Sequence, residues 1–147
     1  MIPLCDAHAH LADERIFPTR ETLLDECRAH GVVQILANAA QADEWERIIE
    51  LTEQPGVLGA FGIHPFWPEQ WTPDAERALL AFLRDDSLRG RIVAIGEIGL
   101  DFWDGRDNAA AQIEAMANLR RTVDRLEGLV DDSRWPIPKY REMLFIH

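Results

Sequence analysis

Short apolar runs alternate with longer stretches of helical periodicity along this chain. Apolar residues recur at three- and four-residue steps in four segments, which begin after Thr19, at Gln41, after Thr72 and at Ala109. The apolar runs between and around these helices predict strands at 2–7, 32–37, 57–63, 91–95 and 143–146. Four successive strand–helix units followed by a further strand predict parallel strands joined by helical crossovers.

Residues at the helix ends support these boundaries. Thr19 is the predicted N-cap of the first helix, and Gly31 stands just past its end. Thr72 is a predicted N-cap followed by proline at the first helical position, which favours a helix start. These residues agree with the helical periods they flank.

Two segments carry specific expectations about burial. The second predicted strand, 32–37, is almost continuously apolar, which is typical of a strand buried on both faces. The last helix, 109–129, has an apolar stripe that we expect to face the protein interior. The stripe consists of Ile113, Met116, Leu119, Val123, Leu126 and Val130.

Composition and charge narrow the class of protein. The 147 residues are 47% hydrophobic and 28% charged, which is typical of a globular chain, and no linker divides them, so 1–147 is expected to be a single domain. The formal net charge of −11 argues against a sequence-reading DNA-binding protein, because such a surface repels polyanions. A bound metal ion would still supply a local cationic spot.

Two cysteines, the absence of a recognisable signal peptide and the shortness of the apolar runs predict a cytoplasmic protein that does not cross a membrane.

Polar residues follow the carboxyl ends of the predicted strands, the edge at which parallel α/β proteins build their sites. These residues are His8 and His10 after the first strand, His64 after the third, Glu97 and Asp101 after the fourth, and His147 after the last. Each alone is explained by a cap or a satisfied core group. Together they favour a shared metal site.

The residue types suit a divalent cation. Side chains alternate along a strand, so His8 and His10 point the same way. Imidazoles and a carboxylate are ligands for Zn²⁺ and for Mn²⁺ or Mg²⁺, and such an ion activates water for hydrolysis. Glu97 lies in an apolar context, where an unpaired carboxylate is costly, so it needs either a cation or an arginine partner.

Weaker signals lie near the third and fourth strands. An aromatic loop, Phe66, Trp67 and Trp71, either stacks on a base or sugar or covers a helix end. Arg106 either meets a phosphate or pairs with a neighbouring aspartate such as Asp104.

Three motifs in order resemble the TatD family of metal-dependent hydrolases. They are Asp6-Ala7-His8-Ala9-His10-Leu11, Gly62-Ile63-His64-Pro65 and Gly96-Glu97-Ile98-Gly99-Leu100-Asp101-Phe102. The resemblance covers 1–112 and implies an α/β fold of the (β/α)8 TIM-barrel type, here a partial barrel of about five parallel strands with four helices. It also implies one or two divalent ions (Zn, Mn or Mg) and hydrolysis of phosphodiesters, typically a 3′-to-5′ exodeoxyribonuclease activity on DNA.

By this resemblance His8 and His10 bind one metal, Glu97 is shared between two ions, and His64 and Asp101 line the pocket. The family takes another histidine from its fifth strand, which His147 matches. A histidine from the sixth strand and an aspartate from the eighth, the implied base for the attacking water, have no counterpart in the sequence.

The segment 113–147 departs from the family pattern and is interpreted as a divergent or truncated tail. A full barrel has eight strands and ~250 residues. The chain is therefore expected to be a fragment, to be completed by a second copy or another chain, or to form a small open sheet. Two alternatives to the phosphodiesterase stay open: an inactive metal-binding fragment that needs a partner chain, and a related amide or ester hydrolase.

Overall fold

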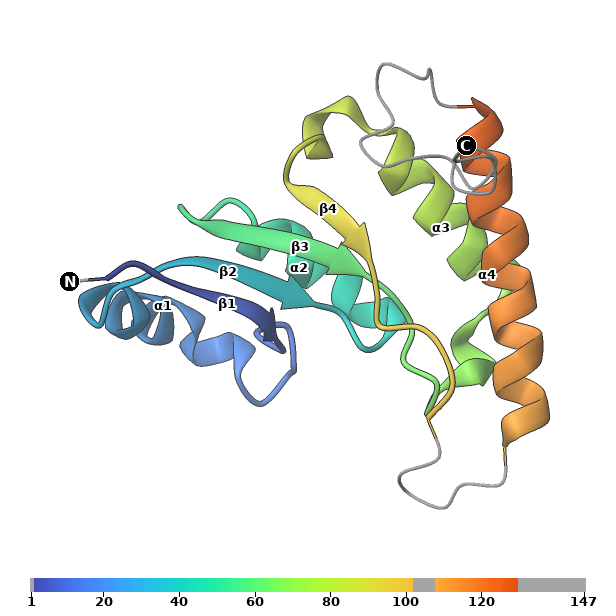
Figure 1. The fold of residues 1–147 in the computed structure, drawn as a ribbon, viewed down its shortest axis with the longest axis horizontal. Coiled ribbons are helices and arrows are strands. Elements are labelled where there is room, and N and C mark those ends of the chain that lie inside the picture. The colour runs from blue at the N-terminus through green and yellow to red at the C-terminus, as the bar shows by residue number, and fades with distance from the viewer. Residues whose placement is uncertain (1, 102–107, 130–147) are drawn as a thin grey trace, which may run out of the picture.

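A computed structural model describes residues 2–101 and 108–129, with side chains up to Arg125 (Figure 1). Strands and helices alternate as the sequence predicts. The strands are β1 (Leu4–Ala9), β2 (Val32–Asn38), β3 (Val57–Phe61) and β4 (Ile92–Ile95), and the helices are α1 (Arg20–Ala29), α2 (Trp45–Leu51), α3 (Pro73–Arg84) and α4 (Ala109–Leu129). Short 3-10 turns precede or follow them at Phe17–Thr19, Ala42–Glu44, Pro68–Gln70 and Asp86–Leu88.

The four strands form one parallel sheet in the order β1-β2-β3-β4 (Figure 1). Each strand pairs with the next one along the chain, and right-handed crossovers in such an order place the helices on one face, as in the wall of a (β/α) barrel. The predicted parallel α/β architecture is confirmed. The predicted fifth strand, 143–146, lies outside the described residues.

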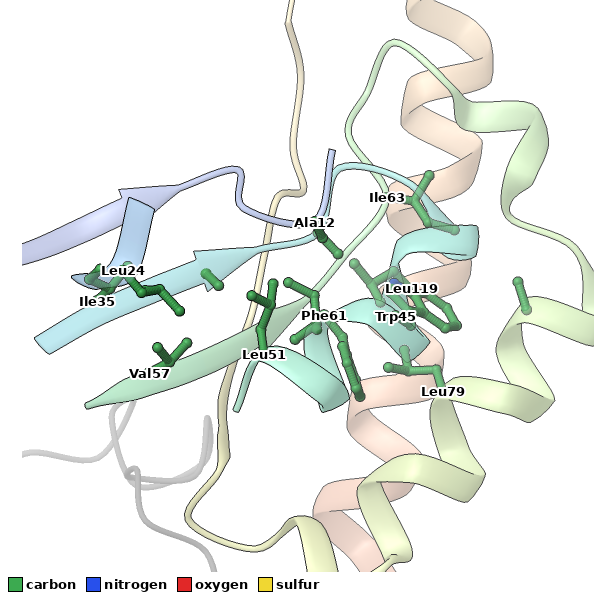
Figure 2. Close-up of a cluster of buried hydrophobic side chains, with 14 residues drawn as sticks. Ala12, Leu24, Ile35, Trp45, Leu51, Val57, Phe61, Ile63, Leu79 and Leu119 are labelled. Atoms are coloured by element: carbon green, nitrogen blue, oxygen red, sulfur yellow. The ribbon is translucent and has the colours of Figure 1, made fainter. Parts of the chain in front are cut away.

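The hydrophobic core lies between the sheet and its helices (Figure 2). Leu24 of α1, Ile48 of α2 and Leu79 of α3 are at most 2% exposed and belong to one cluster with Phe61 of β3. The Trp45 ring lies 5.8 Å from the Phe61 ring, and its Nε1 donates a hydrogen bond to the buried Gly62 carbonyl at 3.0 Å. This aromatic contact fixes the carboxyl end of β3, from which His64 extends.

The expectation that β2 is buried on both faces is wrong for its amino-terminal half. Val33 is 57% exposed and Gln34 is also exposed, whereas Ile35, Ala37 and Asn38 are buried. A parallel sheet buries both faces only where layers cover both, and here the helices cover one face.

The predicted buried stripe of α4 is also wrong in its first half. Ile113 and Met116 are 57% and 41% exposed, while Gln112, Leu119 and Thr122 are 1%, 6% and 0% exposed. Burial of the two polar residues is possible because both have hydrogen-bond partners. The Thr122 hydroxyl, for example, donates to Glu76 Oε1 of α3 at 2.9 Å.

The two predicted N-caps differ in outcome. The Thr72 hydroxyl accepts a hydrogen bond from the Ala75 N–H at 3.2 Å and caps α3, with Pro73 at the first helical position. Thr19 precedes α1, but its hydroxyl donates to the Ile16 carbonyl at 2.9 Å and does not cap the helix. The 3-10 turn at Phe17–Thr19 leads directly into α1, so this helix begins without a side-chain cap.

Both cysteines, Cys5 and Cys27, are free. Among the helices of the described part of the chain, none combines the length and the hydropathy that a membrane crossing requires.

Candidate metal centre

Two histidines and a glutamate converge at the carboxyl edge of the sheet. His8 Nε2 lies 2.6 Å and His10 Nε2 3.3 Å from Glu97 Oε1, and the two Nε2 atoms are 3.2 Å apart. His8 lies on β1, His10 just beyond it, and Glu97 follows β4. The structure therefore brings together three of the side chains that the sequence singled out.

β1 and β4 are the outer strands of the described sheet. The contact between His8 and Glu97 therefore reports on the curvature of the sheet. Neighbouring strands lie about 4.8 Å apart, so three steps across a flat sheet separate the outer strands by roughly 14 Å. A 2.6 Å approach of His8 to Glu97 requires the carboxyl ends of the strands to converge. The sheet is thus curled in the manner of a barrel wall.

The donor set fits a divalent cation. The candidate ligand atoms of His8, His10 and Glu97 all lie within 4.8 Å of one another. A neutral imidazole and a carboxylate each present a lone pair, and three lone pairs at one point repel unless a proton or a cation lies between them. The Glu97 side chain is only 16% exposed, and within the described residues its ion-pair partners are the two histidines, with no arginine among them.

Backbone contacts hold these ligands in place. The Gly96 N–H donates to the Phe61 carbonyl at 2.9 Å, which ties the start of the Glu97 segment to β3. A Cβ on Gly62 would lie 2.1 Å from the Gly96 carbonyl carbon and 2.2 Å from the Glu97 nitrogen. Only glycine fits there. On the other side of the site, Asp6 Oδ1 accepts the His8 N–H at 3.0 Å.

The turn after His10 carries an ion pair. Arg15 Nη2 lies 2.6 Å from Asp13 Oδ2, and the Arg15 backbone N–H donates to Asp13 Oδ1 at 2.9 Å. Hydrogen bonds from this arginine hold the pKa of the Asp13 carboxyl well below its usual range. Asp13 is therefore ionised at any pH at which the histidines can act as ligands.

A second polar pair, His64 and Asp101, lies past the carboxyl ends of β3 and β4. His64 Nε2 is 3.5 Å from Asp101 Oδ2. His64 Nδ1 accepts the Phe66 N–H at 3.2 Å, so a neutral His64 carries its proton on Nε2, facing the carboxylate. The His64 backbone is fixed by its N–H bond to the Ala40 carbonyl at 2.8 Å.

The structure bears on the aromatic loop of Phe66, Trp67 and Trp71 but not on Arg106. Trp67 and Trp71 pack against the hydrophobic core, which favours the covering role over base stacking for these two rings. The Phe66 ring lies edge-on to His64, with centroids 4.6 Å apart. Arg106 and His147 lie outside the described residues.

Sequence reasoning missed Gln112 and Asn108. Gln112 Nε2 donates to the Asp101 carbonyl at 2.9 Å and to Asn108 Oδ1 at 2.6 Å, and its Oε1 accepts the Asp101 N–H at 3.0 Å. The spacing along the helix could have indicated that Gln112 is buried. Gln112 is seven residues before Leu119, which is buried, so the two residues share a helix face.

A singly wound parallel sheet with its polar groups gathered at the carboxyl edge defines the class of (β/α)-barrel proteins. Within that class, residues 5–126 match the sequence profile of the family described as TatD related DNase. The chain belongs to this family.

Similarity to individual proteins agrees with this assignment. The chain is 30% identical over 111 residues to human deoxyribonuclease TATDN3, covering 69% of this chain and 39% of that protein. It is 29% identical over 98 residues to the 3′-5′ ssDNA/RNA exonuclease TatD of Salmonella typhimurium, covering 66% and 36%. The crystal structure of YjjV, a TatD homologue from Escherichia coli K12, superposes with a TM-score of 0.71 at 25% identity, covering 84% and 48%. The chain thus spans less than half the length of each of these relatives.

Proposed function

We propose that this chain forms the amino-terminal part of a divalent-metal-dependent phosphodiesterase that removes nucleotides from the 3′ end of single-stranded DNA. His8, His10 and Glu97 hold the metal. The observation that carries the proposal is their convergence, with both imidazole Nε2 atoms within 3.3 Å of one carboxylate oxygen. A divalent ion bound there supplies a Lewis acid for the phosphoryl oxygen and lowers the pKa of a bound water.

The remaining residues of the site form a fixed polar pair. Both ring nitrogens of His64 are engaged, Nδ1 by the Phe66 N–H and Nε2 by the Asp101 carboxylate, so Asp101 keeps the ring in one orientation at the wall of the substrate pocket. Glu97, mostly buried, keeps both histidines directed to one point.

The names of the relatives support a nucleic-acid substrate, and the charge is compatible with one. The Salmonella relative is named a 3′-5′ ssDNA/RNA exonuclease. With a net charge of −11, the chain has no long-range attraction for DNA, so the metal has to provide the positive charge that meets the phosphate. A short single-stranded end suits this arrangement better than a long duplex.

A competing function is metal binding without turnover. It is favoured by the share of human TATDN3 that the chain spans, 39%, and by the histidine and the aspartate that the family resemblance implies and that have no counterpart in this sequence. In that case the same three side chains bind an ion, and hydrolysis needs a completing chain.

Nucleotide release from a 5′-labelled single-stranded DNA in the presence of Mn²⁺ or Zn²⁺ tests the proposal. His10→Ala is expected to lower the rate on the order of 100-fold, since it removes a metal ligand. His30→Ala is the matched control, because His30 lies at the end of α1 with its Nδ1 against the Glu26 carbonyl, and it is expected to retain the wild-type rate. Equal rates for His10→Ala and wild type contradict the proposal; metal binding without any release favours the competing function.

A further inference from the structure

The buried side chain of Gln112 makes two of its three hydrogen bonds as donor or acceptor with Asp101. Gln112 is 1% exposed. Its Oε1 accepts the Asp101 N–H and its Nε2 donates to the Asp101 carbonyl, at 3.0 and 2.9 Å. A side-chain amide that bonds to both backbone groups of the same residue fixes that residue as a neighbouring strand would.

The second N–H of the same amide extends the network toward His64. Gln112 Nε2 donates to Asn108 Oδ1 at 2.6 Å, and Asn108 Nδ2 lies 3.5 Å from the carbonyl of Pro65, the residue that follows His64. Both N–H donors and the oxygen of Gln112 are therefore used. The first turn of α4 contacts the backbones of the two segments that carry Asp101 and His64.

A packing role alone does not explain an amide at this position. An apolar side chain would fill the interior without the desolvation cost of a buried amide, which is recovered only through well-formed hydrogen bonds. The amide makes these bonds to the Asp101 segment, whose carboxylate lies 3.5 Å from His64 Nε2. The bonds thus fix the backbone from which that carboxylate extends.

We infer that Gln112 is a positioning residue, which sets Asp101 opposite His64 by holding the Asp101 backbone. This inference rests on the proposed function and deepens it, because it assigns to α4 the alignment of the His64–Asp101 pair. Gln112 acts through Asp101 and Asn108 and is not itself a catalytic residue.

Amide hydrogen exchange of Asp101 and the imidazole ¹⁵N signals of His64 test the inference, both measured without metal or substrate. In Gln112→Met, which keeps the length and removes the polar atoms, the protection of the Asp101 amide is expected to fall about tenfold, in line with one lost hydrogen bond. The His64 Nε2 signal is expected to shift. Thr122→Val is the matched control, since it removes another buried hydrogen bond of α4, to Glu76, and is expected to change neither readout.

Gln112→Glu keeps the inference testable if Gln112→Met does not fold. An ionised carboxylate accepts the Asp101 N–H but cannot donate to the Asp101 carbonyl, whereas the protonated acid can do both. Because the second oxygen of the ionised carboxylate repels the Asp101 carbonyl oxygen and so loosens this segment, Asp101 protection is expected to be lower at pH 7.5 than at pH 5, where the buried acid is protonated, in this variant only. Unchanged protection in Gln112→Met, or the same protection at both pH values in Gln112→Glu, overturns the inference.

Because neither readout uses metal or DNA, failure of this inference is distinct from failure of the proposed function. A chain that binds no metal still reports on whether Gln112 holds Asp101. A chain that hydrolyses DNA with Asp101 unaffected by the Gln112 variants retains the proposed function and removes this inference.

Discussion

Replacing Glu97 with glutamine is expected to weaken Zn²⁺ or Mn²⁺ binding by on the order of 100-fold, because an anionic ligand becomes a neutral amide of the same size. Glu97 contacts both histidines, at 2.6 and 3.3 Å, so its charge is central to the site. Isothermal titration calorimetry with the metal alone measures the effect. The fold is expected to persist, since the side chain keeps its volume.

Glu21→Gln serves as the matched control for that titration. Glu21 is exposed in the first turn of α1 and is expected to leave the metal affinity unchanged. Loss of a metal ligand is expected to weaken binding far more than threefold. If Glu97→Gln binds the metal within about threefold of the wild-type affinity, Glu97 is not a ligand.

Gly62→Ala is expected to have the second large effect, on stability and metal binding together. The new Cβ would lie 2.1 Å from the Gly96 carbonyl carbon and 2.2 Å from the Glu97 nitrogen, and both are backbone atoms. The segment that carries Glu97 must move, at a cost of about 3 kcal/mol of unfolding free energy or more. Urea denaturation measures the stability, and the metal titration of the folded fraction measures the site.

Gly59→Ala is the control that distinguishes the effect of steric crowding alone from the effect of moving Glu97. Its Cβ would lie 2.6 Å from methyl groups of Ile48 and Ile92, which are side-chain atoms and not backbone atoms of the segment that carries Glu97. This variant is expected to lose about 1–3 kcal/mol and to keep the wild-type metal affinity once folded. If Gly62→Ala binds metal as tightly as Gly59→Ala, the close approach of β3 to the Glu97 segment is not what positions the ligand.

The strand ends and their polar residues were predictable because they depend on local periodicity. Alternation along β1 places His8 and His10 on one side, and the apolar run 92–95 places Glu97 just past β4. Parallel strands then bring these carboxyl ends to one edge of the sheet. The amount by which that edge curls, which determines whether Glu97 reaches His8, depends on contacts between distant segments and is visible only in the structure.

The faces of α4 were predicted less well for the same reason. Apolar content suggested that Ile113 and Met116 are buried, yet Gln112 and Thr122 face the interior. Their partners, the Asp101 backbone and Glu76, come from other elements, so no local pattern could have indicated that these polar groups are satisfied. Likewise, Pro73 gives Thr72 a start signal that Thr19 lacks, and only Thr72 caps its helix.

The most direct test of the metal centre is the anomalous scattering of crystals grown with Zn²⁺. The account predicts one strong peak about 2.0–2.2 Å from His8 Nε2, His10 Nε2 and a Glu97 oxygen. A zinc peak that is held by other side chains, with His8 and His10 still in contact with Glu97 and no metal between them, would contradict it.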